Sequence, residues 1–370
     1  MLKENHSITR AKNHGCPIGT AAFFSLAVRS HKKENQMKLI ELKESELRSI
    51  TLFLIDKKVI FHPKISPNGI PDFTGYHGKK FCLILDRNLV VKILRLVSQG
   101  ELKDKFDLKL VSSLLLWAEL NNIAVTSGLA QMEYSHHHGN DIEASKENNV
   151  FLKIFDQYDP THWLDLALGR RLTIPPVKLE GKIDYKFFME NDHYKMHYLE
   201  MLKLSQLYYD NSTSIEQKFE SLYQWVFNNI LICKYTTFFA ALAFGGKSKM
   251  FRNQETSFEA VDKKCRNQAW DLTYLSLWST QYFYEEDSNE VFLFATHDGE
   301  MKELFTLSHQ ESSEIYRNIF GKEIGDRIID IVSKIYVRRE RPKIDSLNLD
   351  NMIVKEKDNL KQILKKYYTI

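Results

Sequence analysis

Four acidic side chains lie at or near the ends of apolar segments that have the length of short strands or helices. Asp86 ends the run FCLILD, Glu133 follows IAVTSGLAQM, Asp271 lies in NQAWDLTYLSLW, and Asp298 follows VFLFATH. Parallel strands end at one edge of a sheet, so side chains from distant sequence positions can meet there in a single pocket. Several carboxylates in one pocket repel one another, and a bound cation relieves that repulsion.

The chemistry of such a cluster is that of a metal-dependent hydrolase. Hard divalent cations such as Mg²⁺ or Mn²⁺ prefer oxygen ligands, and in hydrolysis they activate water and neutralise charge on a phosphate. We therefore predict a nuclease whose metal ligands and catalytic groups are Asp86, Glu133, Asp271 and Asp298. The alternative is that these acids only cap helices or stabilise turns, where Asp is common.

The segments around these acids predict alternating strands and helices. The apolar run before Asp86 is typical of a buried parallel strand. A helix should follow it and end near Gly100, and a second helix is expected in KLVSSLLLWAELNN. IAVTS should form a short strand, and a helix starting at Gly128 should carry Glu133.

The middle and the end of the chain have a different pattern, with amphipathic helices broken by TIPP and GG and no alternation with strands. Alternation resumes around Asp271 and EVFLFATHD. We expect six segments: a loose leader (1–36), an N-terminal extension (37–80), the first part of an α/β core (81–135), a helical insertion (136–261), the second part of the core (262–310) and a helical tail (311–370).

Four pieces of this chain, in this order, resemble a PIN-domain nuclease: LILDRNLV, NNIAVTSGLAQMEYS, NQAWDLTYLSLW and VFLFATHD. The resemblance covers residues 81–306 in pieces. It implies a three-layer α/β core with a central parallel sheet, Mg²⁺ or Mn²⁺ held by the four acids, and endonuclease activity on RNA. It also implies supporting roles for small polar residues near the acids, namely Asn88, Ser127 and Thr296.

Two features depart from that family pattern. The gap between Glu133 and Asp271 is longer than a compact PIN domain needs, so the insertion must loop out of the core. Arg87 directly follows the first acid. Its side chain either points away from the acidic pocket, since neighbours at a strand end face opposite sides, or binds a substrate phosphate.

The insertion mixes lysines with aromatic residues, and this pattern has two interpretations. Lys195, Lys203 and Lys218 alternate with tyrosines in a way that suits a surface for a nucleic-acid strand. Aromatic residues at helical spacing are more often part of a core. The sequence leaves both open.

Histidines and a glycine-rich turn suggest other chemistry more weakly. His136 to His138 form a run, and His193 and His197 have zinc-ligand spacing, but the sequence does not offer a full set of zinc ligands around them. We expect solvated or hydrogen-bonded histidines. FGGKSK, from Phe244 to Lys249, lacks the first glycine of a phosphate-binding loop, so a basic turn after a helix is expected.

Composition is compatible with this interpretation without requiring it. The chain has 370 residues, 43% of them hydrophobic, which is enough for a large core. The net charge of +3 does not by itself indicate nucleic-acid binding. The four cysteines have no paired spacing, which favours a reducing cytoplasm, and the apolar stretch near the N-terminus is too short to span a membrane.

Other classes of function remain open from the sequence. The chain could be a catalytically silent PIN-like scaffold that binds nucleic acid or a protein partner. It could also be a toxin-like or phage-defence effector that a partner controls, and a homo-oligomer is compatible with each of these.

Overall fold

A computed structural model describes residues 43–67, 69, 71–139, 141–177, 187, 191–231, 233–253, 255–309, 314–336 and 348–368. The predicted leader (1–36) lies outside the described residues. Within them, no helix is both long and apolar enough to cross a membrane.

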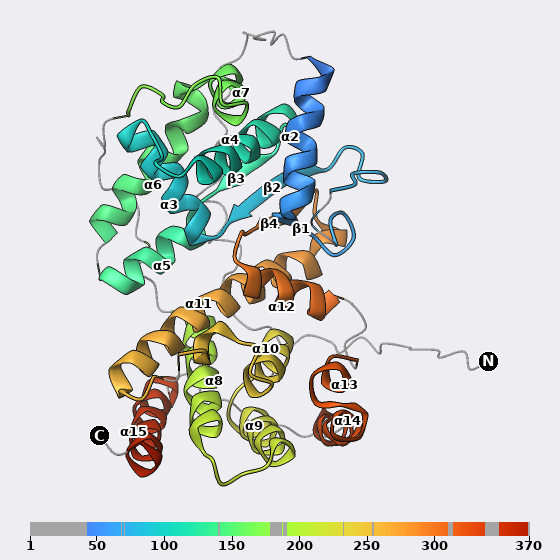
Figure 1. Cartoon of the computed structure of the whole chain (residues 1–370), viewed down its shortest axis with the longest axis vertical. Helices are drawn as coiled ribbons and strands as arrows, with labels where there is room; N and C mark the ends of the chain where they lie inside the picture. The colour runs from blue at the N-terminus through green and yellow to red at the C-terminus, as the bar shows by residue number, and fades with distance from the viewer. Residues whose placement is uncertain are drawn as a thin grey trace, which may run out of the picture.

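A small four-stranded sheet organises one half of the molecule (Figure 1). Its order is β1–β4–β2–β3, with bounds Ile60–Phe61, Glu290–Ala295, Lys80–Leu85 and Ala124–Thr126. Strands β4, β2 and β3 are parallel, whereas β1 pairs antiparallel with β4. The predicted α/β class is confirmed in this coarse form, but the sheet is mixed rather than wholly parallel.

Helices rich in aliphatic side chains cover one face of the sheet. Alternate residues of the central strands, Leu83 and Leu85 of β2 and Val291 and Leu293 of β4, face this layer, as the two-residue period of a strand requires. The layer consists of α2 (Glu44–Lys57), α3 (Arg87–Gln99), α4 (Lys105–Leu120), α6 (Asp141–Gln157) and α7 (Pro160–Ala167). Helices α6 and α7, which the sequence assigned to the insertion, therefore pack beside the sheet (Figure 1).

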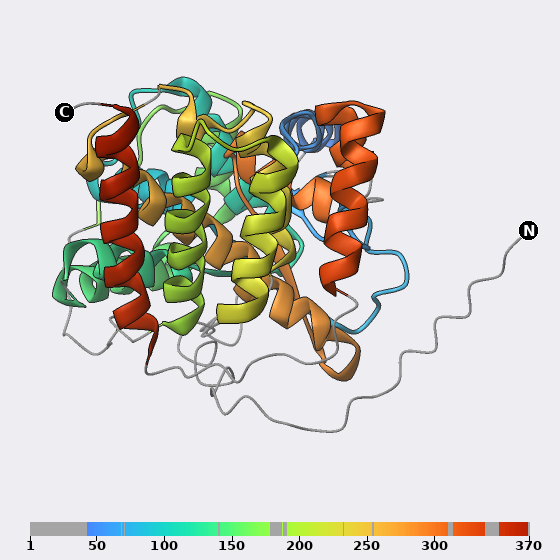
Figure 2. The same cartoon turned by 90° about the horizontal axis from the view of Figure 1, so that it is seen from below.

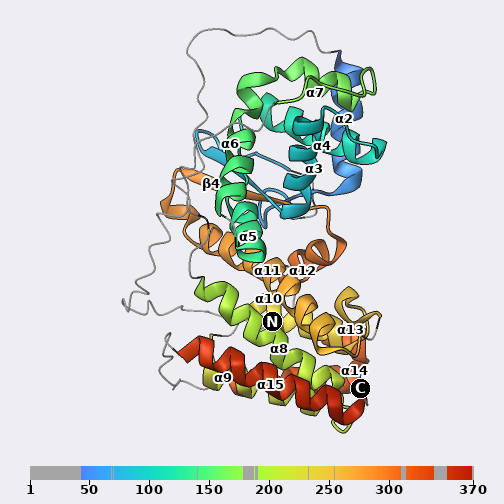
Figure 3. The same ribbon diagram turned by 90° about the vertical axis from the view of Figure 1, so that its left-hand side faces the viewer.

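The opposite face of the sheet packs on two helices from the second part of the core. Ile84 and Phe294 belong to the same hydrophobic cluster as side chains of α11 (Phe258–Phe283) and α12 (Gly299–His309). Trp278 of α11 donates a hydrogen bond from Nε1 to the carbonyl oxygen of Phe292, at 2.7 Å. Helix α11 lies between the sheet half and the helical half of the molecule (Figures 1 and 3).

The helical half is a bundle built from the insertion and the tail. Figure 2 shows helices of this bundle side by side, and the neighbours α15–α8, α8–α9 and α9–α14 are in contact. Its helices are α8 (Asp192–Tyr209), α9 (Ile215–Asn229), α10 (Lys234–Phe244), α13 (Glu314–Phe320), α14 (Lys322–Tyr336) and α15 (Leu349–Tyr367). The elements described within both segments are helices.

Local signals explain the element ends nearest the candidate site. Helix α3 ends at Gly100, whose φ of 79° is left-handed and favours glycine. Ser257 accepts a hydrogen bond from the N–H of Ala260 and so caps the long helix α11. The short helices η1 (Lys249–Phe251) and η2 (Glu285–Asp287) flank α11, and α5 (Gly128–His138) follows β3.

Candidate functional site

Asp86 and Thr296 join the carboxyl ends of two neighbouring parallel strands. Leu85 of β2 lies opposite Ala295 of β4, so the residues that follow them are adjacent. The Asp86 carboxylate accepts the N–H of Leu89 at 2.8 Å and the hydroxyl proton of Thr296, and its residue is 1% exposed. Asp86 is thus both the N-cap of α3 and a buried acid at the sheet edge.

Asp298 occupies the corresponding position at the start of α12. Its Oδ1 accepts the N–H groups of Glu300 and Met301 at 2.8 and 3.1 Å. Its own N–H donates to the Thr296 hydroxyl oxygen at 3.0 Å, so Thr296 links the two acids. The predicted alternative of helix capping therefore holds for Asp86 and Asp298.

Glu133 and Asp271 have no capping role, because both lie inside helices. Glu133 of α5 accepts a hydrogen bond from the Tyr274 hydroxyl at 2.9 Å, and His137 Nε2 is 3.7 Å from its other oxygen. Asp271 lies on α11 one turn before Tyr274 and is half-buried. Within the described residues, its carboxylate makes no hydrogen bond or ion pair.

Burial and mutual repulsion raise the pKa of three of these acids. Burial raises the pKa of Asp86 to about 6, and the charge of Asp298 adds to the rise. Burial raises the pKa of Glu133 to about 7, opposed by the Tyr274 hydrogen bond and Arg87. The pKa of Asp271 is well above its usual range, because of burial and the charges of Glu133, Asp298 and Asp86. The four predicted residues are therefore electrostatically coupled.

The donor set suits a hard divalent cation, although the side chains do not form a closed coordination shell as they stand. Asp271 has no partner in the described structure, and a second acid nearby, Glu300, has its Oε1 buried without a hydrogen-bond partner. Both are oxygen donors of the kind Mg²⁺ and Mn²⁺ prefer. Among the residues described, however, no three His, Cys, Asp or Glu side chains lie together closely enough to hold a metal ion.

The predicted supporting residues lie in different surroundings. Thr296 bonds to Asp86, as described above. Ser127 precedes α5 and is buried, with its hydroxyl 3.4 Å from Oδ1 of Asn148. Asn88 is exposed on the first turn of α3. Of these three residues, Thr296 alone forms hydrogen bonds with any of the four acids in the part of the chain that the structure describes.

Arg87 is engaged within the protein. Its guanidinium forms a two-point ion pair with Glu147, at 2.6 and 3.2 Å, and lies 4.5 Å from the centroid of the Tyr134 ring. Its charge still lowers the pKa of Glu133. Arg87 thus borders the acidic cluster with its side chain held by α6 and α5, and phosphate binding by this residue stays a prediction.

The three lysines of the predicted strand-binding surface lie in the bundle. Lys195 pairs with Asp350 at 2.8 Å, and Lys218 donates to the Tyr208 carbonyl oxygen at 3.2 Å. Burial lowers the pKa of Lys203. The ammonium groups of Lys195 and Lys218 thus contact neighbouring parts of the bundle, and a role of the three lysines in nucleic-acid binding stays a prediction.

The histidines are placed as packing and hydrogen-bonding residues. His136 packs against Tyr194 and Trp270, with ring centroids 5.4 and 5.3 Å away. His197 Nδ1 is 2.7 Å from Glu200, and His193 Nδ1 is 3.3 Å from the Ser276 hydroxyl. These contacts agree with the expectation of hydrogen-bonded histidines.

Sequence reasoning missed several residues around the acids. Tyr274 follows Asp271 by three residues, so both lie on the same face of the helix. This spacing could have predicted that Tyr274 lies near the acids. Lys249, in the turn that imitates a phosphate-binding loop, lies 3.4 Å from Asp298. Lys302 of α12 donates to the Lys57 carbonyl oxygen at 2.7 Å, and burial lowers its pKa to about 8. The sequence indicated Lys249 only as part of an expected basic turn.

Comparisons with protein-family models, with curated proteins and with solved structures found no match. The resemblance to PIN-domain nucleases therefore rests on the four motifs and their order.

Proposed function

We propose that this protein is a metal-dependent endonuclease with a PIN-like three-layer core, and that it hydrolyses phosphodiester bonds in RNA. The proposal is supported by four acids, far apart in sequence, whose charges act on one another at the carboxyl edge of β2 and β4. A scaffold protein gains nothing from such repulsion, whereas a cation site requires it. The choice of RNA follows the family resemblance.

The position of Asp271 is the main support for this proposal. A carboxylate in the middle of a helix, acted on by the charges of four other acids and without a protein partner in the described structure, is costly for the folded protein. A divalent cation would remove that cost. Asp271 has no capping function that would explain its position otherwise.

The chain's own residues would hold and orient the reacting groups. The cation, when bound, supplies activated water and neutralises charge on the phosphate. Asp86, Glu133, Asp271 and Asp298 would hold it. Thr296 and the N–H of Leu89 fix the orientation of Asp86, and Tyr274 fixes that of Glu133. The buried positions of Asp86 and Thr296 keep bulk water from these groups.

Replacing Asp271 by Asn tests the proposal. The variant keeps the size of the side chain and removes one ligand charge, so we expect cleavage of single-stranded RNA in Mn²⁺ to fall by roughly 10³-fold, as for loss of one strong electrostatic contact at a transition state. Glu259→Gln, on the exposed face of the same helix, is the matched control and should cleave normally. Equal activity of Asp271→Asn and wild type would refute the assignment.

The second candidate, a catalytically silent PIN-like scaffold, is favoured by one observation. The acids of the described residues do not converge into a ready-made metal shell. Calorimetric titration with Mn²⁺ separates the two candidates. The nuclease should bind Mn²⁺ with an affinity that Asp271→Asn weakens, whereas a scaffold should show no such binding.

A further inference from the structure

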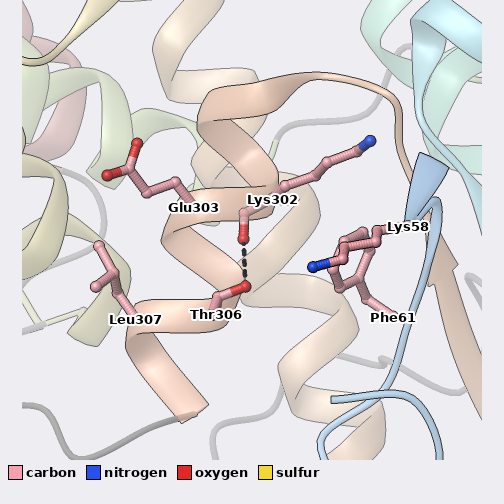
Figure 4. Close-up of a pocket in the computed structure, with 6 residues that line it drawn as sticks. All are labelled: Lys58, Phe61, Lys302, Glu303, Thr306 and Leu307. Carbon is pink, nitrogen blue, oxygen red and sulfur yellow. Dashed lines mark hydrogen bonds between the residues drawn. The ribbon is translucent and has the colours of Figure 1, made fainter. Parts of the chain in front are cut away.

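A pocket of about 240 Å³ lies between β1 and α12, along the helix that begins directly after Asp298. Figure 4 shows its lining residues: Lys58, Phe61, Lys302, Glu303, Thr306 and Leu307. Lys302 and Thr306 follow Asp298 by four and eight residues, which corresponds to about 6 to 12 Å along a helix that rises about 1.5 Å per residue. The pocket is therefore one or two helical turns from the acidic cluster.

Lys58 supplies the positive charge of this pocket. It follows α2 in a left-handed conformation, with φ 49°, and its side chain is exposed. Figure 4 shows its ammonium group directed toward Thr306. Within the described residues, the Lys58 ammonium makes no hydrogen bond or ion pair.

The remaining polar groups are either engaged or turned away from Lys58. The Thr306 hydroxyl donates to the Lys302 carbonyl oxygen at 2.9 Å, and the Lys302 ammonium donates to the Lys57 carbonyl oxygen. Glu303 is exposed at the other rim, and Figure 4 shows its carboxylate pointing away from Lys58. An anion is thus attracted to one end of the pocket and repelled from the other. Phe61, beside Lys58, and Leu307, on the side of Glu303, provide the apolar surface of the pocket (Figure 4).

We propose that this pocket binds one nucleotide of the substrate strand, with its phosphate on Lys58 and its sugar or base against Phe61 and Leu307. The inference rests on the proposed function, since it names how the same site holds its substrate. Pockets for complete small ligands have volumes of about 300–1,000 Å³, so this smaller pocket suits a single unit of a polymer. Because the pocket lies one or two helical turns from Asp298, the bound nucleotide would lie beside the bond that is cleaved.

The test measures binding and not cleavage. A short fluorescent oligoribonucleotide is titrated with the full-length Asp271→Asn protein in EDTA. This parent protein is compared with a double variant that also carries Lys58→Asn. Asn tolerates the left-handed conformation of this position. We expect about tenfold weaker binding at low salt and a salt slope smaller by about 0.7, as for one lost phosphate contact with a single strand.

Lys57→Gln is the matched control, because it removes the same charge at the neighbouring residue. The ammonium group of Lys57 already forms an ion pair with Asp56, at 2.6 Å. Its affinity and salt slope should equal those of the parent. Glu303→Gln should bind at least as tightly as the parent, since a repelling charge is gone. If Lys58→Asn and Lys57→Gln bind alike, or if Glu303→Gln binds more weakly, the nucleotide assignment is wrong.

Competition distinguishes a nucleotide from a free anion. A mononucleotide should displace the oligoribonucleotide from the protein with Lys58, and inorganic phosphate should do so far less well because it makes no apolar contact. Equal competition by the two would make this a free-phosphate site and overturn the proposal. Cleavage by Asp271→Asn in Mn²⁺ is a separate measurement, so failure of the nuclease assignment and failure of the pocket assignment give different results.

Discussion

At the scale of single residues, the raised pKa of Glu133 makes a prediction about stability and pH. Its pKa rises from 4.5 to about 7 in the folded protein, so the folded state holds a proton that the unfolded state has lost. The free energy of unfolding should therefore fall as pH rises from about 4.5 to 7 in EDTA, and stay low above that. The loss from this residue is at most about 3.5 kcal/mol, at about 1.4 kcal/mol per pKa unit.

Glu133→Gln isolates this effect from other titrating groups. His309 acts in the opposite direction, because burial lowers its pKa to about 4 and its ionisation at low pH destabilises the folded state. The difference between wild type and variant removes that contribution. Glu133→Gln should be the more stable protein in EDTA at pH 8 and should equal wild type near pH 4, as measured by urea unfolding. A difference that does not change with pH would contradict the prediction.

At the scale of elements, the turn between α10 and η1 brings the bundle to the acidic cluster. Gly245 must be glycine here, since a Cβ would lie 2.3 Å from Ile319 Cγ2 and 2.9 Å from the Ala241 carbonyl oxygen. Gly246 has a φ of 69°. This turn places Lys249 next to Asp298. The Lys249 ammonium group partly neutralises the negative charge that would attract a metal ion. The ion pair should therefore weaken metal binding.

Lys249→Met tests the role of this turn. Without the competing ammonium, we expect the affinity for Mn²⁺ to increase severalfold, which corresponds to about 1 kcal/mol for a partly exposed ion pair. Electron paramagnetic resonance of free Mn²⁺ measures this directly. Lys247→Met, in the same turn with an exposed side chain, is the matched control and should bind Mn²⁺ as wild type does. Weaker binding by Lys249→Met would instead make Lys249 a positioning residue for the acids.

At the scale of the whole molecule, α11 connects the sheet half and the bundle into one hydrophobic cluster. Trp278 packs against Phe305 of α12 and bonds to the Phe292 carbonyl oxygen of β4, whereas Leu272 and Cys265, on the same helix, are core residues shared with the bundle. Helix α8 is in contact with both α11 and α15 (Figure 3). Because this core is continuous, the two halves should unfold together.

Trp278→Phe tests this coupling. The substitution removes a buried hydrogen bond and leaves a small cavity, so we expect a loss of about 2–3 kcal/mol in the free energy of unfolding. Tryptophan fluorescence and far-ultraviolet circular dichroism should still report one transition. Phe283→Ala, at a side chain that is 78% exposed, should change the stability by less than about 0.5 kcal/mol. Two separated transitions in either protein would show that the halves are independent.

The sequence by itself determined the elements that carry the acids. An apolar run that ends in Asp predicts a buried strand followed by a helix, because Asp can cap the helix with its side chain. This is the local structure found at Asp86, and Asp298 repeats it after β4. The end of α3 at Gly100 and the helical start at Gly128 were also predictable, since both depend on neighbours in the chain.

Only the tertiary structure decided which of these side chains act on one another. The approach of Asp271 to Glu133, the pairing of Lys249 with Asp298 and the antiparallel addition of β1 all join residues far apart in the chain. Helix α11 is apolar on the faces that meet the sheet and the bundle, so its sequence pattern does not specify the neighbour of each face. Side-chain packing makes that choice, and it leaves Asp271 under the charges of four other acids and without a partner in the described structure.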